Sequence, residues 1–136
     1  MEYTYEEIDL GFSTADAEIE SINYYKGQFE LKIIDWQERR LKIKFNDVLA
    51  YSLQFMSYEI KFDEKTSRYM RYSDYDNDTI YNVKDSKWLA KQIEMCTNPY
   101  YSTEKTEHLK HYKLCFNMND EELDIICSEE TIVEEY

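Results

Sequence analysis

The sequence predicts an α+β domain, mainly antiparallel β-sheet, with one short helix packed on it. Apolar and polar residues alternate with the period of two that strands show. Tyrosine, which suits a half-buried pleated surface, occurs 14 times. A single segment has helical spacing instead. We expect six to eight strands in a curved sheet, a sandwich or a barrel-like arrangement, forming one domain over 1–136, because that length is ordinary for a single domain.

The stretches 29–34 and 41–45 form the clearest strand pair, since apolar residues occupy every second position in both. Placing Ile33 opposite Leu41 buries both apolar rows on one face. A slip of one residue would expose a whole row, so we expect this register to hold. It also pairs Leu31 with Ile43, Phe29 with Phe45, Glu30 with Lys44, and Lys32 with Lys42. The last is the one unfavourable pair among them.

Further strands are predicted over 49–55 and 58–62, and weaker ones over 67–72 and 79–83. The helix is predicted over 85–96, with Asp85 or Ser86 as its N-cap. Its apolar face contains Trp88, Leu89 and Ile93, which we expect to be buried against the sheet. The strand residues expected to receive that face are Leu31, Ile43, Leu53, Leu114 and Ile125.

The segment 108–127 holds both histidines and two of the three cysteines, which raises the question of a metal site. Read as strands 109–116 and 123–127, it forms a hairpin in which Phe116 faces Leu123 and Tyr112 faces Cys127. Cys115 then lies on the other face beside His111, with Asp124 opposite. The two cysteines point to opposite sides, so they cannot share a disulfide or converge on zinc. A zinc site remains possible only if 105–111 is helical, which would put His108 and His111 on one side. The odd cysteine count favours reduced thiols and a cytoplasmic location.

The segment 74–85 places Asp74, Asp76 and Asp78 at the first three ligand positions of a calcium loop. Thr79 stands where that loop needs glycine, and Asp85 stands where it needs a bidentate glutamate. An Asx-rich turn between strands, followed by a helix cap, explains the pattern without a metal. We therefore assign no metal ligand.

Enzyme signatures are nearly absent. With only two glycines the chain has neither a phosphate-binding loop nor a dinucleotide fingerprint, and no Gly-x-Ser-x-Gly elbow occurs. On a strand, His111 and Cys115 are about 13 Å apart, too far to act as a pair. We assign no catalytic residue and no cofactor, and expect binding rather than catalysis.

The net charge of −13 is concentrated at the two ends. Residues 1–25 carry seven acidic side chains and residues 117–136 carry eight, with no Lys or Arg in either segment, whereas 26–116 is nearly balanced. Such a chain repels nucleic acid and attracts a basic protein. Solubility alone is the simpler explanation of the acidity. No apolar run is long enough to span a membrane, and the acidic start lacks a signal-peptide pattern.

We expect the two acidic ends to approach each other and to form one surface. The tip of the 109–127 hairpin is predicted to be exposed and to contribute the partner-binding residues Asp120, Glu121, Glu122 and Asp124. Ile8 and Leu10 are expected to anchor the charged N-terminal segment to the core.

Three stretches, "LKIKFNDVLAYSLQ", the Ser-Lys-Trp-Leu helix and "KHYKLCFNMNDEELDIIC", resemble small uncharacterised proteins of low-GC Gram-positive bacteria. The likeness covers about 29–55 and 85–133. More loosely, the chain resembles the acidic immunity proteins that accompany bacterial toxins. The resemblance implies a small β-rich binding module and brings no catalytic residue with it.

Two hypotheses follow. The first is a protein-binding module, of the immunity or inhibitor kind, that engages a basic partner. The second is a small ligand-binding β-barrel or an enzyme with no recognisable motif.

Overall fold

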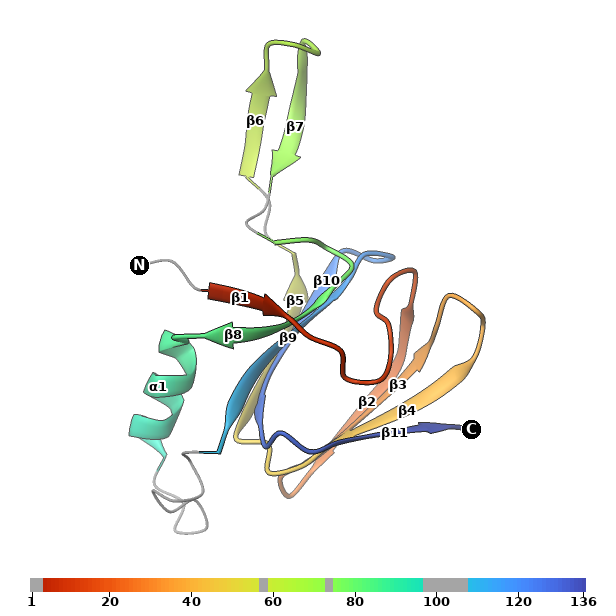
Figure 1. Cartoon of the computed structure of the whole chain (residues 1–136), viewed down its shortest axis with the longest axis vertical. Coiled ribbons are helices and arrows are strands. Elements are labelled where there is room, and N and C mark those ends of the chain that lie inside the picture. The colour runs from red at the N-terminus through yellow and green to blue at the C-terminus, as the bar shows by residue number, and fades with distance from the viewer. Residues whose placement is uncertain (1–3, 57–58, 73–74, 97–107) are drawn as a thin grey trace.

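The computed structural model describes residues 4–56, 59–72, 75–96 and 108–136, which form three antiparallel sheets and one helix (Figure 1). In strand order, the five-stranded sheet contains β1 (Thr4–Glu7), β8 (Ile80–Lys84), β9 (Lys110–Phe116), β10 (Glu121–Cys127) and β5 (Ala50–Phe55). The four-stranded sheet contains β11 (Thr131–Glu135), β4 (Arg40–Phe45), β3 (Gln28–Ile34) and β2 (Glu18–Tyr25). The strands β6 (Glu59–Asp63) and β7 (Arg68–Tyr72) form a hairpin arm that projects from the body.

The predicted fold class is confirmed: the described residues form mainly antiparallel sheet with one short helix, α1 (Lys87–Met95). The described residues contain eleven strands, more than the expected six to eight, and their sheets stay open rather than closing into a barrel. Within these residues no helix is both long and apolar enough to cross a membrane.

The β3–β4 hairpin has the predicted register, with Ile33 opposite Leu41 and Lys32 opposite Lys42. Its inner row packs into a core that lies between the two larger sheets. β2 joins β3 through a two-residue turn, Lys26–Gly27, in which both residues have positive φ (47° and 79°). A type I′ turn requires that conformation, which glycine adopts without steric cost. The N-terminal segment is anchored as predicted, because Ile8 and Leu10 pack against the core.

The register predicted for the second hairpin is wrong by two residues. Leu123 pairs with Leu114, and Ile125 pairs with Tyr112. The turn occupies only 117–120, so β10 begins at Glu121 rather than at Leu123. A shift of two leaves every side chain on its predicted face, because the side-chain period of a strand is also two.

The predicted packing of α1 on the apolar core is also wrong. Ser86 caps the helix as expected, accepting the Leu89 N–H at 3.0 Å. However, no residue of α1 is fully buried, and the Trp88 ring lies 5.0 Å from the ring of His111. His111 belongs to the face of the five-stranded sheet that points away from the core. The helix therefore covers a polar sheet face, and its apolar stripe stays half-buried.

A turn centred on Asp35 closes the β3–β4 hairpin. The Asp35 carboxylate accepts the backbone N–H groups of Gln37 (3.0 Å) and Arg39 (2.8 Å), and also the Arg39 guanidinium (2.9 Å). Burial by itself raises the pKa of Asp35, but these hydrogen bonds outweigh it and hold the pKa below its ordinary value of 3.8.

This lowered pKa predicts a pH-dependent contribution to stability. The contribution is full above the unfolded pKa of Asp35 and is lost as the pH falls through the lower folded pKa. We expect Asp35→Asn to reduce the free energy of unfolding by about 1–2 kcal/mol at pH 7, since the charge-assisted bonds are weakened. As the pH falls through the lowered folded pKa, Asp35 becomes neutral in the native protein as well, so the difference between the two forms in urea unfolding should shrink as the pH is lowered. A loss that does not change with pH would contradict the assignment.

Candidate functional sites

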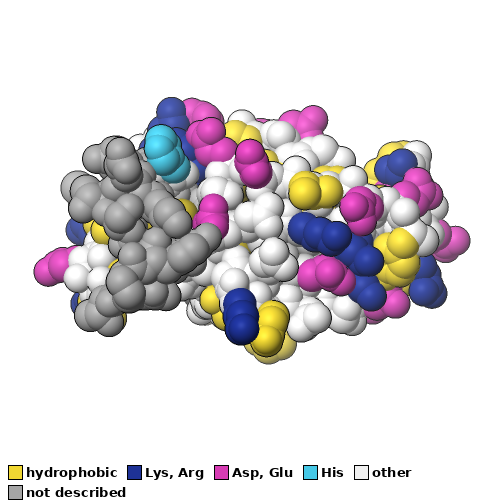
Figure 2. Space-filling model, turned by 90° about the horizontal axis from the view of Figure 1, so that it is seen from below, with side chains coloured by type: hydrophobic (Ala, Val, Ile, Leu, Met, Phe, Trp, Pro, Cys, Tyr) yellow, Lys and Arg dark blue, Asp and Glu magenta, His cyan; other side chains and the backbone are white. Residues whose placement is uncertain are grey.

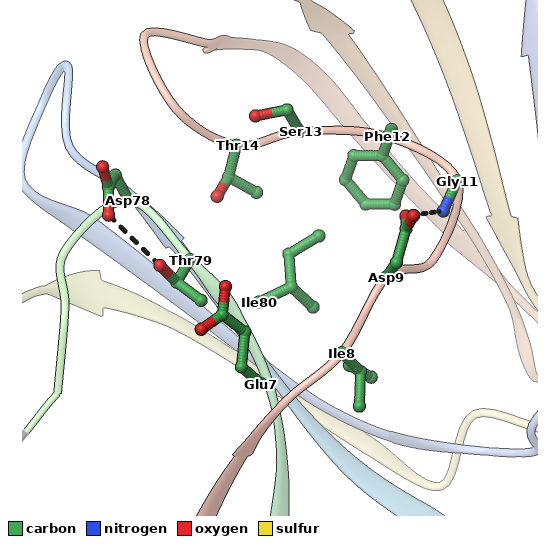
Figure 3. A pocket seen from close by; sticks show the side chains of 10 residues that line it. All are labelled: Glu7, Ile8, Asp9, Gly11, Phe12, Ser13, Thr14, Asp78, Thr79 and Ile80. Carbon is green, nitrogen blue, oxygen red and sulfur yellow. Dashed lines mark hydrogen bonds between the residues drawn. The ribbon is translucent and has the colours of Figure 1, made fainter.

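A hollow of about 540 Å³ opens between the segment that follows β1 and the start of β8 (Figure 3). Its lining includes three acidic side chains, Glu7, Asp9 and Asp78, and none of the described residues that line it is Lys or Arg. Two of the three come from the acidic N-terminal segment. The hollow is thus a concave surface with an excess of negative charge.

Residues 8–11, on one side of the hollow, form a tight turn. The Ile8 N–H donates to the Ile80 carbonyl at 3.0 Å, which extends the β1–β8 pairing by one step. The Asp9 carboxylate then accepts the Gly11 N–H at 2.7 Å. Gly11 has a φ of 93°, a conformation that side-chain-bearing residues rarely adopt, and its position lets the chain reverse around the hollow.

Thr14 lines the same hollow and is 1% exposed. Its Oγ1 has no hydrogen-bond partner among the described residues. Figure 3 shows the hydroxyl directed toward the middle of the space between Asp78 and Asp9. A buried polar atom without a partner is costly, so this hydroxyl is poised to bond a group that enters the hollow.

The two acidic ends approach each other, as predicted. The Asp16 N–H donates to the Asn117 side-chain oxygen at 2.8 Å, and the Tyr136 hydroxyl donates to Glu20 at 2.9 Å. Yet parts of both ends are neutralised locally. Glu20 lies 3.7 Å from Arg40, and a second such pair joins Glu134 to Lys44 at 3.8 Å.

Figure 2 shows one face of the molecule. Toward the right of that view, Lys and Arg side chains lie among Asp and Glu side chains, so neither sign forms a large patch of its own there. The excess of negative charge is therefore distributed unevenly. In the hollow, no described Lys or Arg neutralises the acidic side chains of the lining.

The four predicted partner-binding residues do not form one exposed patch. Glu122 and Asp124 are only 3% and 6% exposed, whereas Asp120 and Glu121 are half-buried. The expectation of an exposed acidic tip was wrong because β10 begins at Glu121. Glu122 and Asp124 are therefore inside a central strand, and their side chains lie on its covered polar face.

These two carboxylates belong to a buried polar chain. The Ser86 hydroxyl lies 2.7 Å from Nδ1 of His111, whose Nε2 lies 2.7 Å from Asp124. Since a carboxylate only accepts, Nε2 carries the proton, and in neutral His111 the Ser86 hydroxyl donates to Nδ1. Lys113 donates to Asp124 at 3.1 Å.

This series of hydrogen-bonded polar side chains continues along β10 to Glu122. Lys113 lies 3.5 Å from Glu122, which also accepts the Gln54 amide at 2.7 Å and the Tyr75 hydroxyl. Burial lowers the pKa of Lys113, but Asp124 and Glu122 outweigh it, so the pKa is raised overall. Burial and Glu122 raise the pKa of Tyr75. The lysine is thus held charged and the phenol protonated.

A smaller cavity of about 250 Å³ adjoins this chain, lined in part by Trp88, Tyr5, His111 and Asp124. Ser86 opens instead into a neighbouring hollow of about 350 Å³, which His111 also lines. Ser86, His111 and Asp124 are thus linked as in a general-base arrangement, although Ser86 also caps α1. Sequence reasoning missed this set because its members are separated along the chain and follow no motif.

The structure bears on part of each metal alternative. β8 occupies 80–84 within the segment 74–85, and Asp74, the first position of the possible calcium loop, lies outside the described residues, as do residues 105–107 of the possible zinc-binding helix. His108 is exposed whereas His111 is buried, and the thiols of Cys115 and Cys127 are buried on opposite faces of the sheet. Burial raises the pKa of each thiol to about 12. Within the described ranges, no group of three or more His, Cys, Asp or Glu side chains is arranged to hold a metal ion.

No protein-family model, curated protein or solved structure matches this chain.

Proposed function

We propose that this protein is a protein-binding module, of the immunity or inhibitor kind, that engages a basic protein through the acidic hollow. The observation behind the proposal is the hollow itself, whose lining includes Glu7, Asp9 and Asp78 and, among the described residues, no Lys or Arg. A concave surface of one charge sign focuses the electrostatic field and steers an oppositely charged partner into it.

An arginine or lysine side chain of the partner fits the chemistry of this hollow. A guanidinium group donates several hydrogen bonds and matches carboxylates in bidentate geometry. The Thr14 Oγ1, buried and without a partner among the described residues, supplies an additional acceptor. Three free cysteines are consistent with a reducing compartment, and we propose the bacterial cytoplasm as the place of action.

An arginine-rich synthetic peptide tests the proposal directly. In an NMR titration of the full chain, amide shifts should concentrate at residues 7–14 and 78–80. Glu7→Gln and Asp78→Asn together should weaken binding by roughly 10-fold, since each removes a charge from the hollow at nearly constant shape. The matched control, Glu64→Gln with Glu130→Gln, removes the same charge from two exposed positions outside the hollow. Equal weakening in both pairs would refute a localised site.

A second function, in which a small ligand or ester is bound and turned over, is supported by the Ser86–His111–Asp124 arrangement. In that case His111 accepts the proton of the Ser86 hydroxyl as the Ser86 oxygen attacks an ester carbonyl carbon, and Asp124 orients the ring. The ester C–O bond then breaks, the leaving alcohol takes the proton from His111, and water hydrolyses the acyl-serine in the same way. The same hydroxyl accepts the Leu89 N–H, so helix capping alone also accounts for its position. A fluorophosphonate probe separates the two roles. A catalytic serine gives an adduct at Ser86 that His111→Gln abolishes, whereas a capping serine gives none.

A further inference from the structure

The strand β5 is an edge of the five-stranded sheet and contains no charged residue. The other edge strands of the two large sheets, β1, β2 and β11, each contain two glutamates. Charged side chains on an edge strand discourage pairing with another chain, and natural proteins use them for that purpose. Among the described strands of these two sheets, β5 is thus the edge without this protection.

The hydrogen-bond pattern shows which backbone groups of β5 are free. The Met56 N–H donates to the Asp120 carbonyl at 2.7 Å, within the same register that pairs β5 with β10. In an antiparallel ladder, successive residues direct their backbone groups alternately to one side and the other. Gln54 and Ser52 therefore bond toward β10, and the odd-numbered residues of β5 present their N–H and C=O groups to the side on which no described strand is paired with β5. At the start of β5 the Tyr51 ring packs on the rings of Tyr24 (5.3 Å) and Phe29 (4.9 Å), so the accessible part of this edge is centred on Leu53 and Phe55.

Those odd-numbered residues are Tyr51, Leu53 and Phe55, which are 42%, 39% and 79% exposed. Their side chains share the face of the core residues opposite them in β10, so the apolar core surface extends to this edge. On the other face, Ser52 and Gln54 line the small polar cavity. The free edge is therefore apolar on one face and polar on the other.

The chain carries further exposed apolar side chains after β5. The arm formed by β6 and β7 begins shortly after Phe55 and projects from the body of the molecule (Figure 1). Ile60, Phe62 and Tyr69 on this arm are all exposed. Exposed apolar side chains of this size are typical of protein interaction sites when they gather on one surface.

We propose that β5 receives an extended segment of the basic partner, which pairs antiparallel with it as a sixth strand. The partner's apolar residues, at every second position, pack on Tyr51, Leu53 and Phe55, and its intervening residues face Ser52 and Gln54. The net charge of −13 favours lysine or arginine at those intervening positions. This inference rests on the proposed protein-binding function and adds a strand-pairing site to it.

The test uses a nine-residue acetylated peptide that alternates valine with lysine. In the free protein, the amides of Tyr51, Leu53 and Phe55 should exchange with solvent rapidly, while those of Ser52 and Gln54 are protected. Saturating peptide should slow exchange at the three odd-numbered amides at least about 10-fold, because each gains a hydrogen-bond acceptor.

Methylated peptides distinguish backbone pairing from loose hydrophobic contact. Directly opposed residues share a face, so the valines are the residues whose backbone groups meet those of β5. A peptide N-methylated at the valines should not protect β5, whereas one N-methylated at the lysines should protect it. Leu53→Lys should abolish the protection, and Ile132→Lys, at an exposed position of β11, is the matched control that should retain it.

Two results would overturn the inference. The first is that the peptide leaves exchange at β5 unchanged. The second is concentration-dependent protection of β5 without peptide, which would mean that a second copy of the chain occupies the edge. The arginine-rich peptide tests the hollow separately. If the valine–lysine peptide protects β5 but the arginine-rich peptide causes no shifts at 7–14, the hollow is not a binding site and the strand-pairing site stands. If the arginine-rich peptide shifts 7–14 but β5 is not protected, only the strand-pairing site is refuted.

Discussion

Replacing Asp124 by alanine should lower the free energy of unfolding by about 3–5 kcal/mol, the range observed when one partner of a buried ion pair is removed. Asp124 accepts from both His111 and Lys113 and is 6% exposed. Its loss leaves Lys113 buried with Glu122 as its remaining close carboxylate and leaves the His111 Nε2–H without its acceptor. In the folded protein both groups would be buried without a full set of partners, whereas in the unfolded chain water hydrates them. This difference lowers the free energy of unfolding.

Urea denaturation measures this loss, and two variants serve as controls. Glu130→Ala removes an exposed carboxylate and should change stability by less than about 0.5 kcal/mol. Asp124→Asn keeps an acceptor of similar shape, so its loss in free energy of unfolding should lie between those of Asp124→Ala and Glu130→Ala. If Asp124→Ala cost less than about 1 kcal/mol, the buried polar chain would not be held together as described.

The β3–β4 hairpin was predictable to the residue because its two strands each bury one apolar row, and only one register satisfies both. The paired faces of β9 and β10 were predictable for the same reason, but their alignment was not. It depends on where the turn ends, and the acidic residues 120–122 resemble turn as much as strand. β1, β2 and β11 escaped prediction because their apolar residues do not alternate regularly with polar ones, and in β2 a register shift between Ile19 and Ser21 interrupts the period.

The candidate sites were harder to predict than the fold. The polar chain beside α1 consists of charged side chains on a sheet face that composition marks as solvent-exposed. These side chains are buried because Trp88 and Tyr75 lie against them, and no local sequence pattern predicts those contacts. The acidic hollow joins Glu7 and Asp9 to Asp78, which is distant in sequence. The acidity of the N-terminal segment is evident from the sequence, but its position beside Asp78 is not.

Reversing charge in the hollow should produce the largest effect on binding. Glu7→Lys with Asp78→Lys turns an acidic concavity into one that repels a cation. We expect the association rate constant of the arginine-rich peptide to fall by roughly 10- to 100-fold at low ionic strength. At about 0.5 M salt the Debye length is only a few ångströms, so most of that difference should disappear.

The most direct test of the hollow as the binding site compares this reversal with a matched one by stopped-flow association. Glu64→Lys with Glu130→Lys changes the net charge by the same amount at exposed positions outside the hollow. If the hollow binds the partner, its reversal slows association far more than the control reversal does, and the gap closes at high salt. If both reversals slow association equally, the peptide responds only to net charge, and the hollow is not a binding site.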